Sequence, residues 1–419
     1  MDRRIGRKQE NKRLASHHPL VMIDFNAVLV GPKADESESE RRSMMVDTSG
    51  VSRRDFLRSA GLVVAGGVVA ACSGGAITTT TLGRTTTSAA TGATSSTAGG
   101  ATTTLAEKLL EVRWGYGNPD STVAGFTEAI WPPFAARRNV NLDAFSLSPN
   151  VTPEILASGR ADAVGFNPIT SLNIQLAEGG KPRVIVHTQP VNDYMVVANK
   201  ERVPTIEDLA GTNFGISEPS SISYVIPRLM AEAASVDFDT VTLVPVGGTS
   251  GRAQALLAGQ IDAGAVYTDV AFQLVHDDPN LHIVGVGTDY VDLAFSSMNA
   301  AGPFLDNEEN RDGIVRLLMS RAELLKFLIE NKDEFIAQYL ERFEGTAEVL
   351  DEVHEFYSTS GMWDPDLTLD LAGLEETMRI YLEEVEPPFA QGELPVDQWV
   401  DTSFRDEAIE RLGGEGWWR

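Results

Sequence analysis

Polar and aromatic side chains gather directly after apolar segments at several places in this chain. They are amide and carboxylate groups, hydroxyl groups and aromatic rings, which hydrogen-bond to a small solute or stack on it. None of them pairs a nucleophile with a base, so we expect ligand binding without catalysis. The candidate ligand-binding residues are Asn118, Asp120, Phe166, Asn167, Gln189, Tyr194, Ser217, Ser220, Ser221, Thr249, Tyr267 and Asp269.

Each candidate also has a structural alternative. Ser, Thr, Asn and Asp at the start of a helix commonly cap it, and capping alone accounts for a residue such as Asn118 or Asp120. The helix expected to begin near Ser221 can instead bind an anionic group through its free N–H groups. Phe166 and Tyr267 follow equivalent strands, which favours an aromatic sandwich around a flat solute, with half-buried packing as the alternative.

The charges in these turns favour a neutral or cationic heterocyclic solute over an anion. Asp120, Glu218 and Asp269 lie in three of the turns, and the nearest Lys or Arg is Arg252. Residues 247–251 (GGTSG) are glycine-rich but lack the lysine of a nucleotide-binding P-loop. At the expected crossovers between lobes, Asp193, Ser296 and Ser297 are predicted to line the back of a cleft.

A repeated phrase predicts the scaffold that positions these residues. Residues 156–163 (LASGRADA) and 256–263 (LLAGQIDA) share Leu, Gly, Asp and Ala in register. The glycine suits a helix C-cap, and the aspartate begins the next strand. Strands alternate with helical patterns around both copies, which predicts two α/β lobes with mostly parallel sheets and a cleft between them.

The order of the elements predicts the domain boundaries. Residues 105–198 and 296–419 are expected to form lobe one, and residues 199–295 lobe two. After Asn307 apolar residues recur at helical spacing, so the C-terminal part is predicted to be a helical segment.

Composition excludes several classes of function. The chain has 419 residues, 34 Lys+Arg against 60 Asp+Glu and a net charge of −26, so it lacks the basic face of a nucleic-acid-binding protein. The single cysteine, Cys72, excludes an intramolecular disulfide, and the six histidines show no zinc-binding spacing. We expect no metal, no cofactor and no enzymatic activity, and we expect a monomer.

The N-terminal region resembles an export signal. Residues 52–58 (SRRDFLR) resemble the twin-arginine signal, and residues 60–71 are apolar but too short to span a bilayer. Residues 69–72 (VAAC) resemble a bacterial lipoprotein box, which implies lipidation of Cys72 and anchoring to the outer face of the cytoplasmic membrane. Residues 1–71 are thus an N-terminal extension and signal, and Met44 or Met45 is the expected translation start.

Residues 72–104 are rich in Thr, Ser, Ala and Gly, and such a segment cannot bury enough apolar surface to fold. As a flexible coil it reaches roughly 30 Å end to end. It is therefore predicted to be a tether that holds a folded body above the membrane.

The signal, the tether and the two interleaved lobes resemble the substrate-binding proteins of ABC importers, over about residues 110–406. The closest likeness is to the group that binds sulfonates, nitrate or thiamine-precursor pyrimidines. The resemblance implies a two-lobe periplasmic-binding-protein-like α/β fold of type II, with two crossovers as a hinge and a small solute between the lobes. Permease and ATPase subunits would receive the solute. The residues that support the resemblance are 114–116 (WGY), the two phrases, 205–211 and 395–404.

Two other functions remain open at this stage. A receptor that presents its solute to a membrane kinase would have the same fold and cleft. A secreted enzyme is the second alternative, but the enzyme branch of the family carries a Cys-rich motif, and this chain has one cysteine at the lipidation position.

Overall fold

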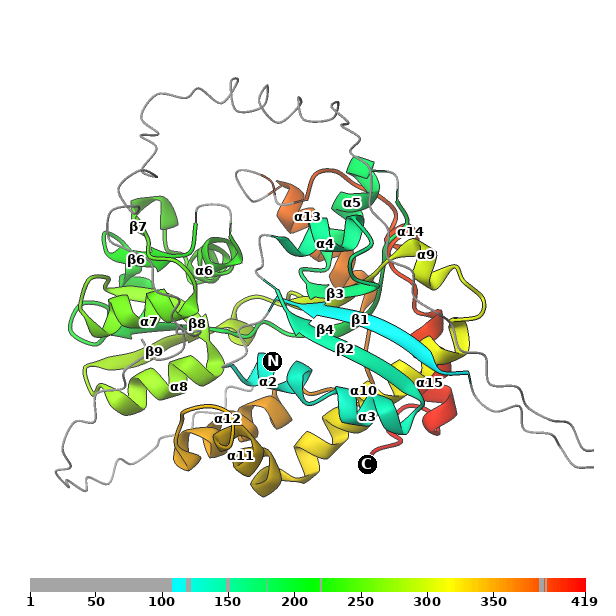
Figure 1. Ribbon diagram of the computed structural model, residues 1–419. Helices are drawn as coiled ribbons and strands as arrows, with labels where there is room; N and C mark the ends of the chain where they lie inside the picture. Colours follow the sequence, from blue (N-terminus) through cyan, green and yellow to red (C-terminus); the bar gives the residue numbers. More distant parts are fainter. Residues whose placement is uncertain are drawn as a thin grey trace, which may run out of the picture. The chain divides into compact units, whose positions relative to one another are not determined.

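The computed structural model describes residues 108–117, 122–147, 151–178, 180–218, 221–383, 388 and 390–419. The predictions for the export signal, Cys72, the tether, Asn118, Asp120 and Ser220 lie outside these residues. The described chain alternates strands and helices up to residue 300 and is helical beyond it (Figure 1).

The first sheet has five strands in the order β2-β1-β3-β10-β4. β1 pairs in parallel with β2 and β3, whereas β10 runs antiparallel between β3 and β4. The strands are β1 (Leu110–Tyr116), β2 (Val140–Ser146), β3 (Ala163–Phe166), β4 (Arg183–Gln189) and β10 (Ser296–Ala300). The helices between them are α2 (Val123–Ala129), α3 (Pro132–Arg137), α4 (Thr152–Ala157) and α5 (Ile169–Glu178).

The second sheet has the corresponding order β7-β6-β8-β5-β9. β6 pairs in parallel with β7 and β8, and β5 runs antiparallel between β8 and β9. The strands are β5 (Tyr194–Asn199), β6 (Asn213–Ile216), β7 (Thr242–Pro245), β8 (Ala263–Tyr267) and β9 (Leu281–Val286). The helices are α6 (Ile222–Ala233), α7 (Thr249–Leu257) and α8 (Thr268–Asp277), with short 3₁₀ turns η3 (Ile206–Leu209), η4 (Phe238–Thr240) and η5 (Gly287–Asp289).

The repeated sequence motif, residues 156–163 and 256–263, has the same structural role in both sheets. Gly159 and Gly259 have φ of 68° and 64°, the left-handed conformation of a helix C-cap. The Asp162 carboxylate accepts a 2.9 Å hydrogen bond from the N–H of Arg113 on β1, and Asp262 accepts a 3.0 Å bond from the N–H of Asn213 on β6. Each aspartate therefore ties the start of the central strand of its sheet, β3 or β8, to the neighbouring parallel strand, β1 or β6.

The first crossover lies earlier than the sequence predicts. Residues 194–198 were assigned to lobe one, but β5 pairs through its whole length with β8 and β9 of the second sheet. The chain therefore crosses over between Gln189 and Tyr194. It returns between η5 and β10.

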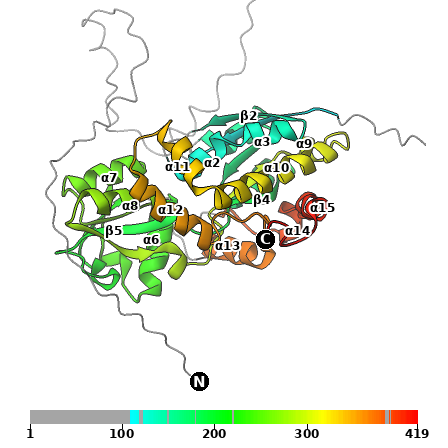
Figure 2. The same cartoon turned by 90° about the horizontal axis from the view of Figure 1, so that it is seen from below.

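The predicted helical C-terminal segment is present. It consists of α9 (Gly302–Leu305), α10 (Arg311–Glu330), α11 (Lys332–Leu340), α12 (Ala347–Thr359), α13 (Leu371–Glu383), α14 (Val396–Trp399) and α15 (Ser403–Leu412). α10 lies along the first sheet, whereas α12 packs on α8 of the second (Figure 2), with the rings of Phe272 and Phe356 6.4 Å apart. The segment therefore contacts the elements of both sheets.

A buried ion pair joins α10 to α2 in the hydrophobic core beside the first sheet. Arg321 on α10 donates two hydrogen bonds, of 2.8 and 3.0 Å, to the Glu128 carboxylate on α2, and the Trp114 indole N–H donates a third of 3.0 Å. Both charged side chains are at most 2% exposed.

No helix in the described part of the chain is both long enough and apolar enough to cross a bilayer.

Candidate functional site

The first crossover places a buried carboxylate where the two sheets meet. Asp193 is fully buried, and its Oδ2 accepts hydrogen bonds from Gln189 Nε2 at 2.8 Å and from the Tyr357 hydroxyl at 2.7 Å. Gln189 ends β4 of the first sheet, and Tyr357 comes from α12. We refer to Gln189, Asp193, Tyr194, Tyr267, Asp269, Phe295 and Tyr357 as the crossover cluster.

Burial sets the charge of Asp193. Desolvation, and to a lesser extent the nearby charge of Asp269, raise its pKa to about 7, while hydrogen bonds from Tyr357 and Thr268 oppose the rise. The Thr268 N–H donates at 3.2 Å to the main-chain carbonyl of Asp193. Asp193 Oδ1 and the adjacent Gln189 Oε1 are both buried and have no hydrogen-bond partner.

Asp269 joins elements of the two sheets. It is the second residue of α8, and its Oδ2 accepts a 2.6 Å hydrogen bond from the N–H of Val123, the first residue of α2. Its Oδ1 accepts a 2.9 Å bond from the N–H of Val270. Desolvation raises the pKa of Asp269 to about 6, although these backbone donors oppose the rise.

Three aromatic rings form the wall of the cluster. Tyr194 lies 5.3 Å from Tyr267 and 5.0 Å from Phe295 between ring centroids, and Tyr267 lies 5.9 Å from Phe295. Burial raises the pKa of the Tyr267 and Tyr357 hydroxyls well above the usual value, so both stay protonated donors. Phe166 is half-buried and packs beside Gly117. The structure thus groups Tyr267 with Tyr194 and Phe295, and the sandwich with Phe166 stays a prediction.

Arg252 holds two of the predicted ligand-binding hydroxyls. Its guanidinium is buried and donates to Ser217 Oγ at 2.6 Å and to Thr249 Oγ1 at 3.0 Å. It also donates to the carbonyls of Ala265 (2.5 Å) and Gly247 (3.1 Å), and it lies 5.7 Å from the ring centroid of Tyr194. The side chain therefore ties α7 to the ends of β6 and β8.

Two further candidates make local hydrogen bonds. The Asn167 Oδ1 accepts a 2.8 Å bond from the N–H of Ile169 at the start of α5, which is the capping alternative. The Ser221 hydroxyl donates to the carbonyl of Glu218 at 2.8 Å and lies 2.6 Å from the Ser223 hydroxyl. Neither contact tests a role for these residues in binding a solute.

Phe295, Tyr357 and Arg252 are not among the residues predicted from the sequence, and Asp193 was predicted only to line the back of a cleft. Tyr357 lies 164 residues beyond Asp193 on a C-terminal helix, so no local pattern links them. Arg252 follows the glycine-rich stretch by one residue, and that position was the available signal.

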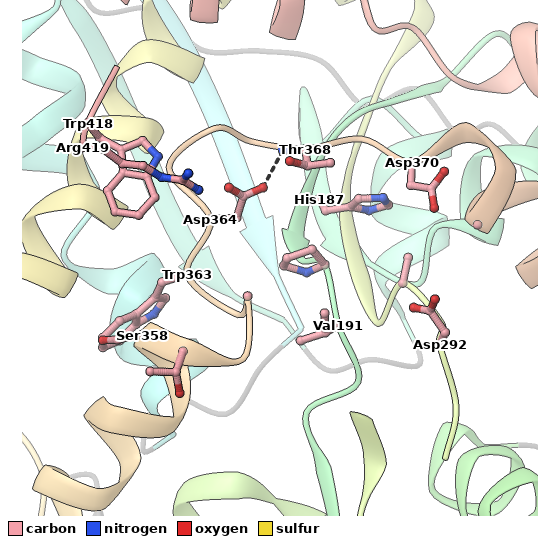
Figure 3. A pocket seen from close by; sticks show the side chains of 15 residues that line it. His187, Val191, Asp292, Ser358, Trp363, Asp364, Thr368, Asp370, Trp418 and Arg419 are labelled. Atoms are coloured by element: carbon pink, nitrogen blue, oxygen red, sulfur yellow. Dashed lines mark hydrogen bonds between the residues drawn. The ribbon is translucent and has the colours of Figure 1, made fainter. Parts of the chain in front are cut away.

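A separate cavity of about 380 Å³ lies against both crossovers (Figure 3). The crossovers contribute Val191 and Asp292, and the C-terminal segment contributes Asp364 and Trp418. His187 lines it with Nδ1 2.7 Å from Ser297 Oγ, and burial lowers the pKa of His187 to about 4, so the ring is neutral near pH 7. The cavity has no lining residue in common with the crossover cluster.

The paired sheets, the double crossover and the helical C-terminal segment define the class as a periplasmic-binding-protein-like fold. Residues 148–326 match the family model described as ABC transporter, phosphonate, periplasmic substrate-binding protein. No curated protein matches the sequence significantly.

Solved structures show the same fold. The chain is similar to the sulfonate ABC transporter protein SsuA, a putative periplasmic sulfonate-binding protein of Methylobacillus flagellatus KT, at 16% identity and a TM-score of 0.55, over 74% of this chain and 97% of that one. It is also similar to the nitrate-binding protein NrtA of Synechocystis PCC 6803, at 14% identity and a TM-score of 0.56, over 73% and 90%. The predicted resemblance to ABC-importer substrate-binding proteins is confirmed.

Proposed function

We propose that this chain is an extracytoplasmic solute-binding lipoprotein that captures a small solute between its two lobes and delivers it to an ABC permease with its ATPase. The first sheet with the C-terminal segment forms one lobe, and the second sheet forms the other. The family match and the relatives named for sulfonate and nitrate support this function. Export by the twin-arginine route, lipidation of Cys72 and a monomeric state belong to the same proposal.

The observation that supports the proposal most is the meeting of both sheets at the crossovers. Gln189 from β4, Asp193 from the first crossover and Phe295 from the second lie with Tyr267 from β8. In open α/β sheets, ligands bind beyond the carboxyl ends of the strands, where β4 and β8 end here. A solute held at this place contacts both lobes at once.

Closure then follows from differential binding. A solute that touches both lobes in one arrangement and only one lobe in another stabilises the first arrangement. The Asp269–Val123 hydrogen bond joins the lobes in the structure described here. A permease that recognises the joined arrangement would take up loaded protein in preference to empty protein.

The two relatives are named for sulfonate and nitrate, the matching family model is described for phosphonate, and the resemblance seen in the sequence also implies pyrimidine-like solutes. Of these, the crossover cluster favours the uncharged or cationic heterocycles. Asp193 and Asp269 place two carboxylates there, and the Arg252 guanidinium already donates to four acceptors.

The experiment that tests this function is thermal unfolding of the full chain against sulfonates, nitrate, phosphonates, pyrimidines, polyamines and amino acids. A solute present at 100 times its Kd should add about 2.7 kcal/mol to the free energy of unfolding. Tyr267→Ala should reduce the shift, whereas the exposed Leu340→Ala should leave it unchanged. Chemical turnover of a stabilising solute would contradict the proposal.

A further inference from the structure

We propose that the solute carries a cationic group rich in N–H donors, such as an amidinium or a protonated amine, and that Asp193 Oδ1 and Gln189 Oε1 bind it. The inference rests on the proposed function, because Asp193 is fully buried and Gln189 is 3% exposed. A solute reaches these oxygens only when the lobes move apart.

Two buried acceptor oxygens of the crossover cluster are incompletely hydrogen-bonded. More than nine-tenths of buried polar groups in folded proteins have a partner, so two adjacent buried acceptors without one require an explanation. Gln189 Nε2 and the Tyr357 hydroxyl both donate to Asp193 Oδ2. Neither Asp193 Oδ1 nor Gln189 Oε1 accepts a hydrogen bond of normal geometry, although Thr268 lies near the Asp193 carboxylate. The protein therefore provides acceptors here and leaves the donors to another molecule.

The charges around the site favour a cationic solute. Among the described residues, Asp193 and Asp269 form no ion pair with Lys or Arg, and the charge of Asp269 raises the electrostatic cost of ionising Asp193. The nearest guanidinium, Arg252, is engaged by Ser217, Thr249 and two carbonyls. An anionic solute would face two carboxylates, whereas a cation would neutralise them and make charge-assisted hydrogen bonds.

Three packed aromatic rings lie beside Asp193. Tyr194 follows Asp193 directly in the chain and packs against Tyr267 and Phe295. Aromatic faces attract cations and stack on flat rings. A planar ring attached to the cationic group would therefore contact the tyrosines while its N–H groups reach Asp193.

The test compares three solutes that share one ring and differ in the charge of the attached group: benzamidine, benzamide and benzenesulfonate. Isothermal titration calorimetry of the full chain should show binding of benzamidine, weaker binding of benzamide and no binding of benzenesulfonate. Asp193→Asn should weaken benzamidine binding by about 10- to 100-fold, since it removes one charge-assisted hydrogen bond. The matched control is Asp239→Asn, because the Asp239 side chain is 81% exposed. This variant should bind benzamidine with the affinity of the wild type.

A second measurement separates ligand binding from a purely structural role. Asp193 holds an unpartnered buried oxygen, so Asp193→Asn should not lower the unfolding temperature of the solute-free protein, although it weakens cation binding. Preferential binding of benzenesulfonate, failure of benzamidine to bind, or equal benzamidine affinity in wild type and Asp193→Asn would each overturn the inference. Binding of any anion with stabilisation would still support the proposed function, which fails if no solute of any charge binds or if a bound solute is chemically turned over.

Discussion

The carboxylate of Asp269 accepts a 2.6 Å hydrogen bond from the main-chain N–H of Val123, and these residues belong to helices packed on different sheets. Asp269 lies in the first turn of α8, and Val123 is the first residue of α2. The bond is charge-assisted when Asp269 is ionised, and both groups are buried. It is therefore a direct link between the two lobes whose strength depends on one carboxylate.

Removing this link should favour separation of the lobes. Asp269→Ala deletes a charge-assisted hydrogen bond worth about 1.5–3 kcal/mol, which should shift the balance towards separated lobes by about 10- to 100-fold. Small-angle scattering of the solute-free protein should show a larger radius of gyration. Asp277→Ala, at the exposed end of the same helix, is the control and should scatter like the wild type. Identical scattering from all three proteins would show that the bond does not hold the lobes.

The two crossover carboxylates should make the solute-free protein more stable in mild acid. The pKa of Asp193 is raised to about 7 and that of Asp269 to about 6, so between about pH 4 and pH 7 the folded protein binds more protons than the unfolded chain. The free energy of unfolding should therefore rise as pH falls from about 7.5 to about 5, by an amount on the order of 1–3 kcal/mol.

Urea titrations at several pH values measure this dependence, and Asp193→Asn combined with Asp269→Asn should flatten it. The effect of His187 has the opposite sign, because its lowered pKa of about 4 means that its contribution is lost as pH falls below about 6.5. If the free energy of unfolding of the double variant still rises as the pH falls, groups other than Asp193 and Asp269 cause the rise. The other titratable or charged groups around the two carboxylates are Tyr194, Tyr267, Tyr339, Tyr357 and Arg252.

Breaking the buried ion pair should destabilise the fold strongly. Glu128→Gln leaves the Arg321 guanidinium, 1% exposed, without a compensating charge, and the expected loss is about 3–5 kcal/mol. The Trp114 indole keeps an acceptor in this variant, so the loss reports the charge rather than the packing. Urea unfolding measures it, with Lys332→Gln in an exposed ion pair as a control that should not change the midpoint. Equal midpoints for both variants would contradict the account of this core.

Gly251 should be required for the position of Arg252. A Cβ at Gly251 would lie 2.1 Å from the carbonyl oxygen of Val246, so Gly251→Ala forces α7 away from the preceding loop and should cost about 1–3 kcal/mol. Gly248 in the same loop has open space at its Cβ position and a negative φ, so Gly248→Ala is the matched control. Thermal unfolding that ranks Gly248→Ala as the more damaging change would refute this reasoning.

Local patterns predicted most of the fold. The helix ends and following strands in the two repeats were predictable from nearby residues alone. In each repeat a glycine, Gly159 or Gly259, adopts the left-handed conformation that ends a helix, and the strand follows within a few residues. The break between α2 and α3 at Trp131 also has a local sequence signal, because Pro132 occupies the first helical position of α3, where its missing N–H is tolerated.

The contacts that build the site were less predictable because they are non-local. An apolar strand such as β5 fits either sheet, and only its pairing with β8 and β9 assigns it to the second. The position of Tyr357 beside Asp193 depends on how α12 packs on α8. Arg252 lies in an amphipathic helix whose inward face places a cation among buried acceptors, which its sequence neighbours do not reveal.

The central claim is that a solute bound between the lobes changes their arrangement, and an interlobe distance tests it most directly. Spin labels at Leu176 on α5 and Leu257 on α7, which are 40% and 46% exposed, report one distance across the two lobes once Cys72 is replaced by Ser. A solute that raises the unfolding temperature should convert a broad distance distribution into a single narrow one. An unchanged distribution in the presence of such a solute would contradict the claim.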